Sequence, residues 1–148
     1  ALNRSGSTRH DTMLQQGHAL TLAGDHTWAL TSFRALTRLA PEWAEGHARV
    51  SAAHAALGDH AACVAAAAEA CRINPSDVWS LLQRGHCLKD LKQTEHAMRI
   101  FRQVTVLHPR MPALRKLRQW MSSVEAAEEL HAAEARRAAR RAADLSPI

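Results

Sequence analysis

Small and apolar residues recur along the chain at the three- and four-residue spacing of helices that bury one face. Ala29, Phe33 and Leu36 show this spacing in the first third of the sequence, and similar stretches follow. Prolines interrupt the pattern at Pro41, Pro75 and Pro109, which are 34 residues apart each time. An apolar pattern broken at a fixed interval predicts a repeated helical unit.

Overlaying the chain on this interval gives three blocks, at residues 10–43, 44–77 and 78–111. Small residues coincide at three positions, an aromatic residue recurs at a fourth position in the outer blocks, and an aliphatic residue precedes each proline by two positions. The coinciding sets are Gly17, Ser51 and Gly85; Ala19, Ala53 and Cys87; Ala29, Cys63 and Ala97; Phe33, Ala67 and Phe101; Leu39, Ile73 and Leu107.

Each block predicts two helices joined by a short turn. In the first two blocks the turn contains Gly24-Asp25 and Gly58-Asp59. Glycine suits the left-handed residue that ends a helix, and aspartate accepts amide hydrogens at the start of the next one. The third block lacks the glycine, and there we expect Thr94 to cap the second helix. Each proline ends its block because it has no amide hydrogen.

The combined pattern resembles the tetratricopeptide repeat over about residues 10–111, with small residues in the first helix, alanine and phenylalanine in the second, and proline at the end. The resemblance implies an all-α fold, a right-handed α–α superhelix of three helix-turn-helix repeats. The middle block departs from the family at Ala67, His47 and His54, where the family favours aromatic residues, and this predicts looser packing there.

The segments outside the blocks predict an unstructured lead-in at residues 1–9, one long helix at 112–144 and a tail at 145–148. Leu114, Leu117, Met121 and Val124 form an apolar stripe, which is expected of a helix that caps the open end of a repeat stack. Beyond Leu130 the stripe becomes alanine and arginine. That half of the helix either projects into solvent or pairs with something absent from this chain.

Composition and charge bear on whether the chain crosses a membrane or binds nucleic acid. The chain has 148 residues, a net charge of +5 and no apolar run long enough for a membrane span. The arginine-rich segment at residues 134–141 has three interpretations: a solvated face, a contact with another protein, or a basic face for RNA or another anionic surface. The absence of interleaved aromatic residues disfavours nucleic acid.

The cysteines do not form a zinc motif, and Cys63 and Cys71 would lie about 12 Å apart along one helix, too far for a disulfide. We therefore expect reduced thiols and a cytoplasmic or nuclear protein. His47 and His54 are about 10 Å apart along a helix, too far to share one metal ion. No nucleophile motif or phosphate-binding loop is present. The sequence predicts no enzyme activity, no metal and no cofactor.

The first helices of such repeats line a concave groove, whose inner side chains are free to contact a ligand. The helical period assigns nine residues to this partner-binding groove. Trp79 is the expected anchor, because tryptophan is frequent among interface hot spots, although its ring could instead pack between helices. The nine are Leu14, Gln15, His18, Glu45, Arg49, Trp79, Gln83, His86 and Lys89.

The predicted function is a protein-interaction module, an adaptor or scaffold that binds a partner peptide or helix. A first alternative follows from the co-chaperone branch of the family, whose groove holds lysine, arginine and asparagine residues that clamp the acidic C-terminal tails of heat-shock chaperones. Arg49 falls on the arginine position of that clamp, but Glu45 replaces a lysine and Gln15 an asparagine. A second alternative is the targeting domain of a larger enzyme.

Overall fold

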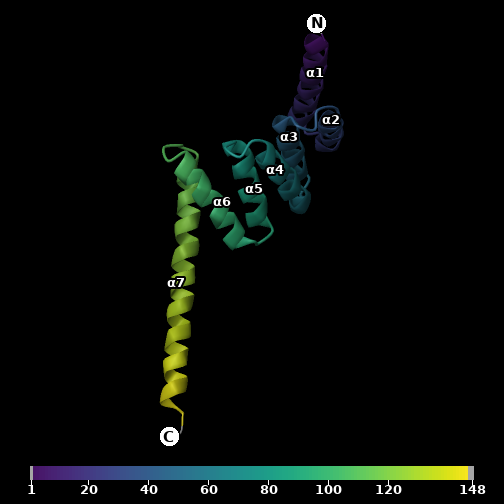
Figure 1. Cartoon of the computed structure of the whole chain (residues 1–148). Coiled ribbons are helices and arrows are strands. Elements are labelled where there is room, and N and C mark those ends of the chain that lie inside the picture. The colour runs from purple at the N-terminus through teal and green to yellow at the C-terminus, as the bar shows by residue number, and fades with distance from the viewer. Residues whose placement is uncertain (1, 147–148) are drawn as a thin grey trace. The chain divides into compact units, whose positions relative to one another are not determined.

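A computed structural model describes the backbone of residues 2–146 and the side chains of residues 9–146, and all its regular elements in that range are helices. Figure 1 shows the seven helices. They are α1 (Leu2–Leu22), α2 (His26–Leu39), α3 (Ala44–Ala56), α4 (His60–Ile73), α5 (Val78–Asp90), α6 (Thr94–Leu107) and α7 (Leu114–Asp144). Consecutive helices from α1 to α6 pack on one another, and α3 also contacts α5. The predicted all-α fold of three helix pairs is confirmed.

The turns within the first two repeats are built as the sequence predicts. Gly24 and Gly58 have positive φ angles of 80° and 79°, and the carboxylates of Asp25 and Asp59 accept hydrogen bonds from the backbone amides of Trp28 and Ala62. Each carboxylate therefore satisfies one of the amides that a helix start leaves without a partner.

The turn of the third repeat differs from the prediction. Lys92 takes the left-handed conformation with φ of 62°, and Gln93, without a side-chain hydrogen bond, occupies the N-cap position of α6. Thr94 is the first residue of the helix, so the expected cap at Thr94 is wrong. The turn keeps the same length as the other two and therefore places Gln93 where they have aspartate.

The core of the outer repeats depends on the missing side chain of one glycine. A Cβ atom added to Gly17 would lie 2.3 Å from a ring carbon of Phe33, and one added to Gly85 would lie 2.4 Å from a ring carbon of Phe101. Both rings are buried, with 2% and 0% exposed surface. The first helix can approach its partner closely only because glycine leaves room for the ring.

Cys63 and Cys87 form a disulfide bond with a Cα–Cα distance of 6.3 Å, which corrects the expectation of reduced thiols. The two cysteines lie on α4 and α5, so the bond joins the second repeat to the third. Spacing along one helix excludes only a bond between Cys63 and Cys71, whereas the packing of α4 on α5 brings together residues 24 positions apart. Cys71 is free and buried.

The two ends of the chain differ in part from the predicted lead-in and C-terminal helix. Helix α1 begins at Leu2, so residues 2–9, expected to be unstructured, continue the first helix. Residues 1–109 and 110–148 form two separate compact units, and α7 belongs to the second. Its predicted apolar stripe includes three buried residues, Leu114, Leu117 and Met121. None of the described helices is both long and apolar enough to cross a membrane.

Candidate functional site

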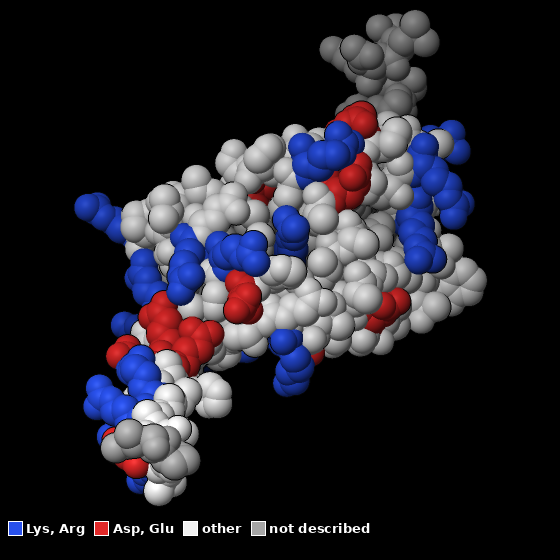
Figure 2. Space-filling model, turned by 60° about the horizontal axis from the view of Figure 1, so that its bottom comes forward, with Lys and Arg blue, Asp and Glu red and all other residues white. Residues whose placement is uncertain are grey.

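The predicted groove residues come from the first helix of each repeat, α1, α3 and α5. All nine keep part of their surface accessible: Gln15, Trp79 and His86 are exposed, and the other six are half-buried. We call these nine residues the predicted groove face. Its charges are mixed, with the acidic Glu45 and the basic Arg49 and Lys89. On the face of the molecule that Figure 2 shows, basic and acidic side chains are interspersed.

Glu45 and Arg49 form an ion pair one turn apart on α3. The Nε atom of Arg49 donates to Oε1 of Glu45 at 2.7 Å, and a terminal guanidinium nitrogen lies 2.6 Å from the same oxygen. Both side chains are about one-third exposed, at 31% for Arg49 and 38% for Glu45. Glu45 thus engages two of the five N–H donors of Arg49 and competes with any ligand carboxylate for that guanidinium.

His18 and His86 occupy equivalent positions in the outer repeats and make the same contact. Their rings pack edge-on against Phe33 and Phe101, with centroid distances of 6.0 and 5.2 Å. Burial lowers the pKa of His86, the neighbouring Lys89 lowers it further, and Asp90 acts in the opposite direction. His86 is therefore neutral at physiological pH, and it links the predicted groove face to the core.

Two other predicted groove residues also have structural contacts. Leu14 packs against the hydrophobic cluster that contains Phe33 and Val50, which makes it part of the core as well. The side-chain amide of Gln83 lies 3.9 Å from the sulfur atoms of both Cys63 and Cys87, so Gln83 sits beside the disulfide bond. Spacing alone predicts the face of a helix and does not reveal such contacts.

Trp79 is the most exposed large apolar side chain of the predicted groove face. It lies in the first turn of α5 and has 53% of its surface accessible, so its ring is not packed away between helices. A second exposed tryptophan, Trp28, lies on α2, in the other set of helices, and is 64% exposed. The two residues form a natural comparison, one on the predicted groove face and one outside it.

The sequence pattern did not predict a partly buried polar contact between the first two repeats. Arg34 on α2 lies 3.4 Å from Nε2 of His54 on α3, and His54 is only 6% exposed. Burial lowers the pKa of His54, Arg34 lowers it further, and Asp59 opposes the change. The neutral ring can accept the hydrogen bond from Arg34. The unusual histidine in the middle repeat is the only sequence signal for this contact.

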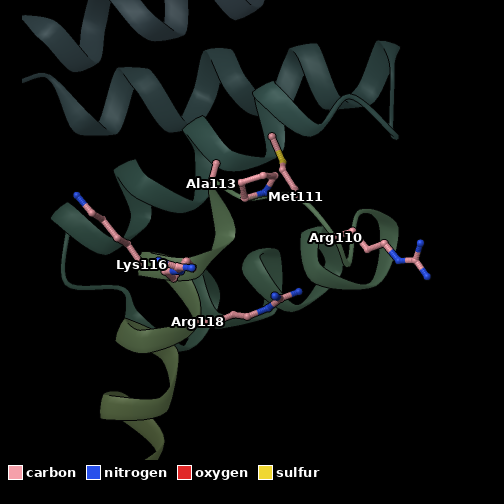
Figure 3. Close-up of a pocket in the computed structure, with 7 residues that line it drawn as sticks. Arg110, Met111, Ala113, Lys116 and Arg118 are labelled. Atoms are coloured by element: carbon pink, nitrogen blue, oxygen red, sulfur yellow. The ribbon is translucent and has the colours of Figure 1, made fainter.

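The placement of the metal-ligating and thiol side chains among the described residues bears on metal binding and thiol reactivity. No group of three or more His, Cys, Asp or Glu side chains among them is placed to hold a metal ion. Burial raises the pKa of the free Cys71 thiol, which disfavours the reactive thiolate. A pocket of 690 Å³ lies at the start of the second unit, between residues 110 and 118. Its lining contains basic and apolar side chains but no acid or nucleophile, and Figure 3 shows Arg110 and Lys116 extending away from one another.

Comparison with known proteins agrees with this architecture. Residues 80–107 match the family model described as tetratricopeptide repeat. No curated protein sequence matches the chain. Among solved structures, the first TPR of Spaghetti (RPAP3) bound to the HSP90 peptide SRMEEVD has a TM-score of 0.76 and 18% identity, over 81% of this chain and 95% of that one.

Two further structures give the same result. The Arabidopsis OM64 TPR domain has a TM-score of 0.73 and 19% identity, over 78% of this chain and 96% of that one. The TPR2B domain of yeast Sti1, in complex with an Hsp70 peptide, has a TM-score of 0.71 and 16% identity, over 80% of this chain and 98% of that one. The third repeat thus matches the tetratricopeptide repeat model, and the three helix pairs share the fold of these TPR domains.

Proposed function

We propose that the chain is an adaptor or scaffold module that binds a peptide or helix of a partner protein on the predicted groove face. The exposed indole of Trp79 carries the proposal, because an aromatic side chain left in solvent on this face is typical of an interface anchor. Helices that are already folded before binding lose little conformational freedom when the partner arrives.

The other side chains of this face suggest the chemistry of the partner. Gln15 and Gln83 offer neutral hydrogen-bonding groups, and the charges of Glu45 and Arg49 largely cancel within their ion pair. Such a face suits a segment with an apolar side chain for Trp79 and polar groups around it. It does not favour a partner with a high net charge of either sign.

Peptide selection followed by titration tests this proposal. Peptides selected from a random displayed library on the wild-type protein would be titrated against wild type, Trp79→Ala and Trp28→Ala. We expect Trp79→Ala to weaken binding about 10-fold or more, as removal of a hot-spot residue does. Trp28→Ala removes an indole from α2 that is at least as exposed and should leave the affinity unchanged. Equal affinities of all three proteins would exclude Trp79 as the anchor.

A co-chaperone function is the second candidate. Two of the similar structures contain peptides of Hsp90 or Hsp70, and Arg49 occupies the position that the resemblance assigns to a carboxylate clamp. Glu45 opposes this function, because it neutralises Arg49 and would itself repel an acidic tail.

Titration with the SRMEEVD peptide at low salt separates the two candidates. If the clamp functions, the wild type binds with micromolar affinity, and Arg49→Ala or added salt weakens the binding. If Glu45 blocks it, the wild type does not bind, whereas Glu45→Lys frees Arg49, supplies the missing lysine and gains measurable affinity. The adaptor proposal predicts the second result, and binding by the wild type would favour the co-chaperone.

A further inference from the structure

The second half of α7 is a helix whose side chains lie in water. From Glu125 to Asp144 every residue is exposed except Ala133, which is half-buried. Figure 1 shows α7 as one continuous helix through this region. In a helix with exposed side chains, the interactions of those side chains with one another affect its stability, so their arrangement along the helix is informative.

Charges of opposite sign are separated along this stretch. Four glutamates come first and four arginines follow; the glutamates are Glu125, Glu128, Glu129 and Glu134, and the arginines are Arg136, Arg137, Arg140 and Arg141. Like charges stand one turn apart at Glu125 and Glu129 and at two pairs of arginines, which destabilises a lone helix. Within the described residues, no ion pair involves any of the four arginines.

The dipole of the helix does not account for this order. Its effect is confined to the first and last turns, and the glutamates begin eleven residues after the helix starts at Leu114. The dipole can favour Arg140 and Arg141 near the C-terminal end, but it does not explain the acidic group in the middle. A partner that supplies the opposite charge to each half would explain both groups.

One face of the helix has a sequence that is complementary to itself. At 100° per residue, Glu125, Glu129, Ala132, Arg136 and Arg140 fall within an arc of about 80°. The stripe has a centre between residues 132 and 133. Each glutamate on one side of this centre has an arginine at the same distance on the other side. At that centre the side chains are alanines, which allow two helices to approach closely.

We propose that two copies of the chain associate through this stripe, with their α7 helices antiparallel. A two-fold axis at the centre places Glu125 opposite the partner's Arg140 and Glu129 opposite the partner's Arg136, and symmetry repeats both pairs. Parallel helices would place acid against acid and base against base. The association is independent of the predicted groove face and of its ligand.

A second copy fits this stripe better than a nucleic acid does. A polyanion would meet the arginines but would be repelled by the two glutamates on the same face. Exposed ion pairs are individually weak and are screened by salt, so the dimer should be weak and should dissociate at high ionic strength.

Charge reversal with complementation tests the proposal by analytical ultracentrifugation of the full chain. At low salt the wild type should approach twice the 16.3 kDa mass of one chain as concentration rises, and it should return to a monomer in 1 M salt. The variants Glu125→Arg/Glu129→Arg and Arg136→Glu/Arg140→Glu each carry one sign along the stripe and should be monomeric. Their equimolar mixture should restore the dimer.

Two further variants control for altered folding and net charge. Arg137→Glu/Arg141→Glu changes the net charge as Arg136→Glu/Arg140→Glu does, but on a face about 100° away, and should still dimerise. The fourfold variant that reverses all four stripe charges is again complementary to itself and should dimerise like the wild type. A wild type that stays monomeric at low salt, or a mixture that fails to restore the dimer, overturns the proposal.

Discussion

The middle repeat and the two outer repeats fill the same space by different means. In the outer repeats a buried phenylalanine on the second helix lies against a glycine on the first, and a histidine packs on the edge of the ring. In the middle repeat the equivalent residues are Ser51, Ala52 and Ala67, so the ring and the histidine contact are both absent.

The middle repeat replaces aromatic packing with polar and covalent links. The hydroxyl of Ser51 donates to the carbonyl oxygen of Cys63 at 3.1 Å, and Cys63 is bonded to Cys87 of the next repeat. Ser51, Ala67 and Cys63 are all fully buried. Ser51 and Ala67 are therefore one compensated exchange: without the ring, the first helix can carry a side chain at the position where glycine is otherwise needed.

Reducing the disulfide should have the largest effect on this comparison. A bond that closes a loop of 24 residues stabilises a protein by about 3.5 kcal/mol on the chain-entropy estimate. We expect dithiothreitol to lower the unfolding free energy by about that amount, measured by urea denaturation. Cys63→Ala/Cys87→Ala should lose the sensitivity to reductant and Cys71→Ala should keep it. A wild type that unfolds identically with and without reductant would contradict the role of the bond.

Adding one methyl group to an outer repeat should have the next largest effect. Gly85→Ala places a Cβ 2.4 Å from the ring of Phe101 and should cost about 1–3 kcal/mol. In the background of Phe101→Ala the same substitution should become neutral or stabilise by up to about 1 kcal/mol, because alanine favours helices over glycine. Urea denaturation of the four proteins in this double-mutant cycle measures the coupling.

A buried glycine of the middle repeat provides the control for that cycle. At Gly46 an added Cβ would meet a methyl group of Thr37 at 3.3 Å, so Gly46→Ala should be milder than Gly85→Ala. Additive effects of Gly85→Ala and Phe101→Ala would show that glycine and ring do not depend on one another, and the explanation of the middle repeat would then fail.

The sequence predicts most of the fold because each repeat depends on local signals. The prolines mark the period, and the Gly-Asp turns set the helix boundaries through backbone conformation and capping. The Cys63–Cys87 bond was not predicted, because it depends on how α4 packs against α5. That packing is a property of the superhelix, and no spacing within one helix reveals it.

The candidate site is less predictable than the fold for a similar reason. The helical period selects the face that carries Trp79, Glu45 and Arg49, but the state of each side chain depends on its neighbours. Arg49 forms an ion pair with Glu45, and Leu14 packs partly against the hydrophobic core. The role of the remaining residues in ligand binding stays a prediction.

The turns within the repeats differ in the residue that takes the left-handed conformation. Exchanging these residues should have the smallest effect on stability. Gly58 and Lys92 occupy equivalent positions and both have positive φ, which costs a lysine about 1 kcal/mol more than a glycine. Lys92 is exposed and no atom lies within 4 Å of a Cβ added at Gly58, so the backbone alone decides the outcome. Lys92→Gly should therefore stabilise the protein by about 1 kcal/mol, and Gly58→Lys should destabilise it by a similar amount. Urea denaturation of the two single variants and the combined exchange measures this, and the combined protein should match the wild type. A stabilising Gly58→Lys would show that contacts of the lysine side chain, and not the backbone conformation, determine which residue the turn accepts.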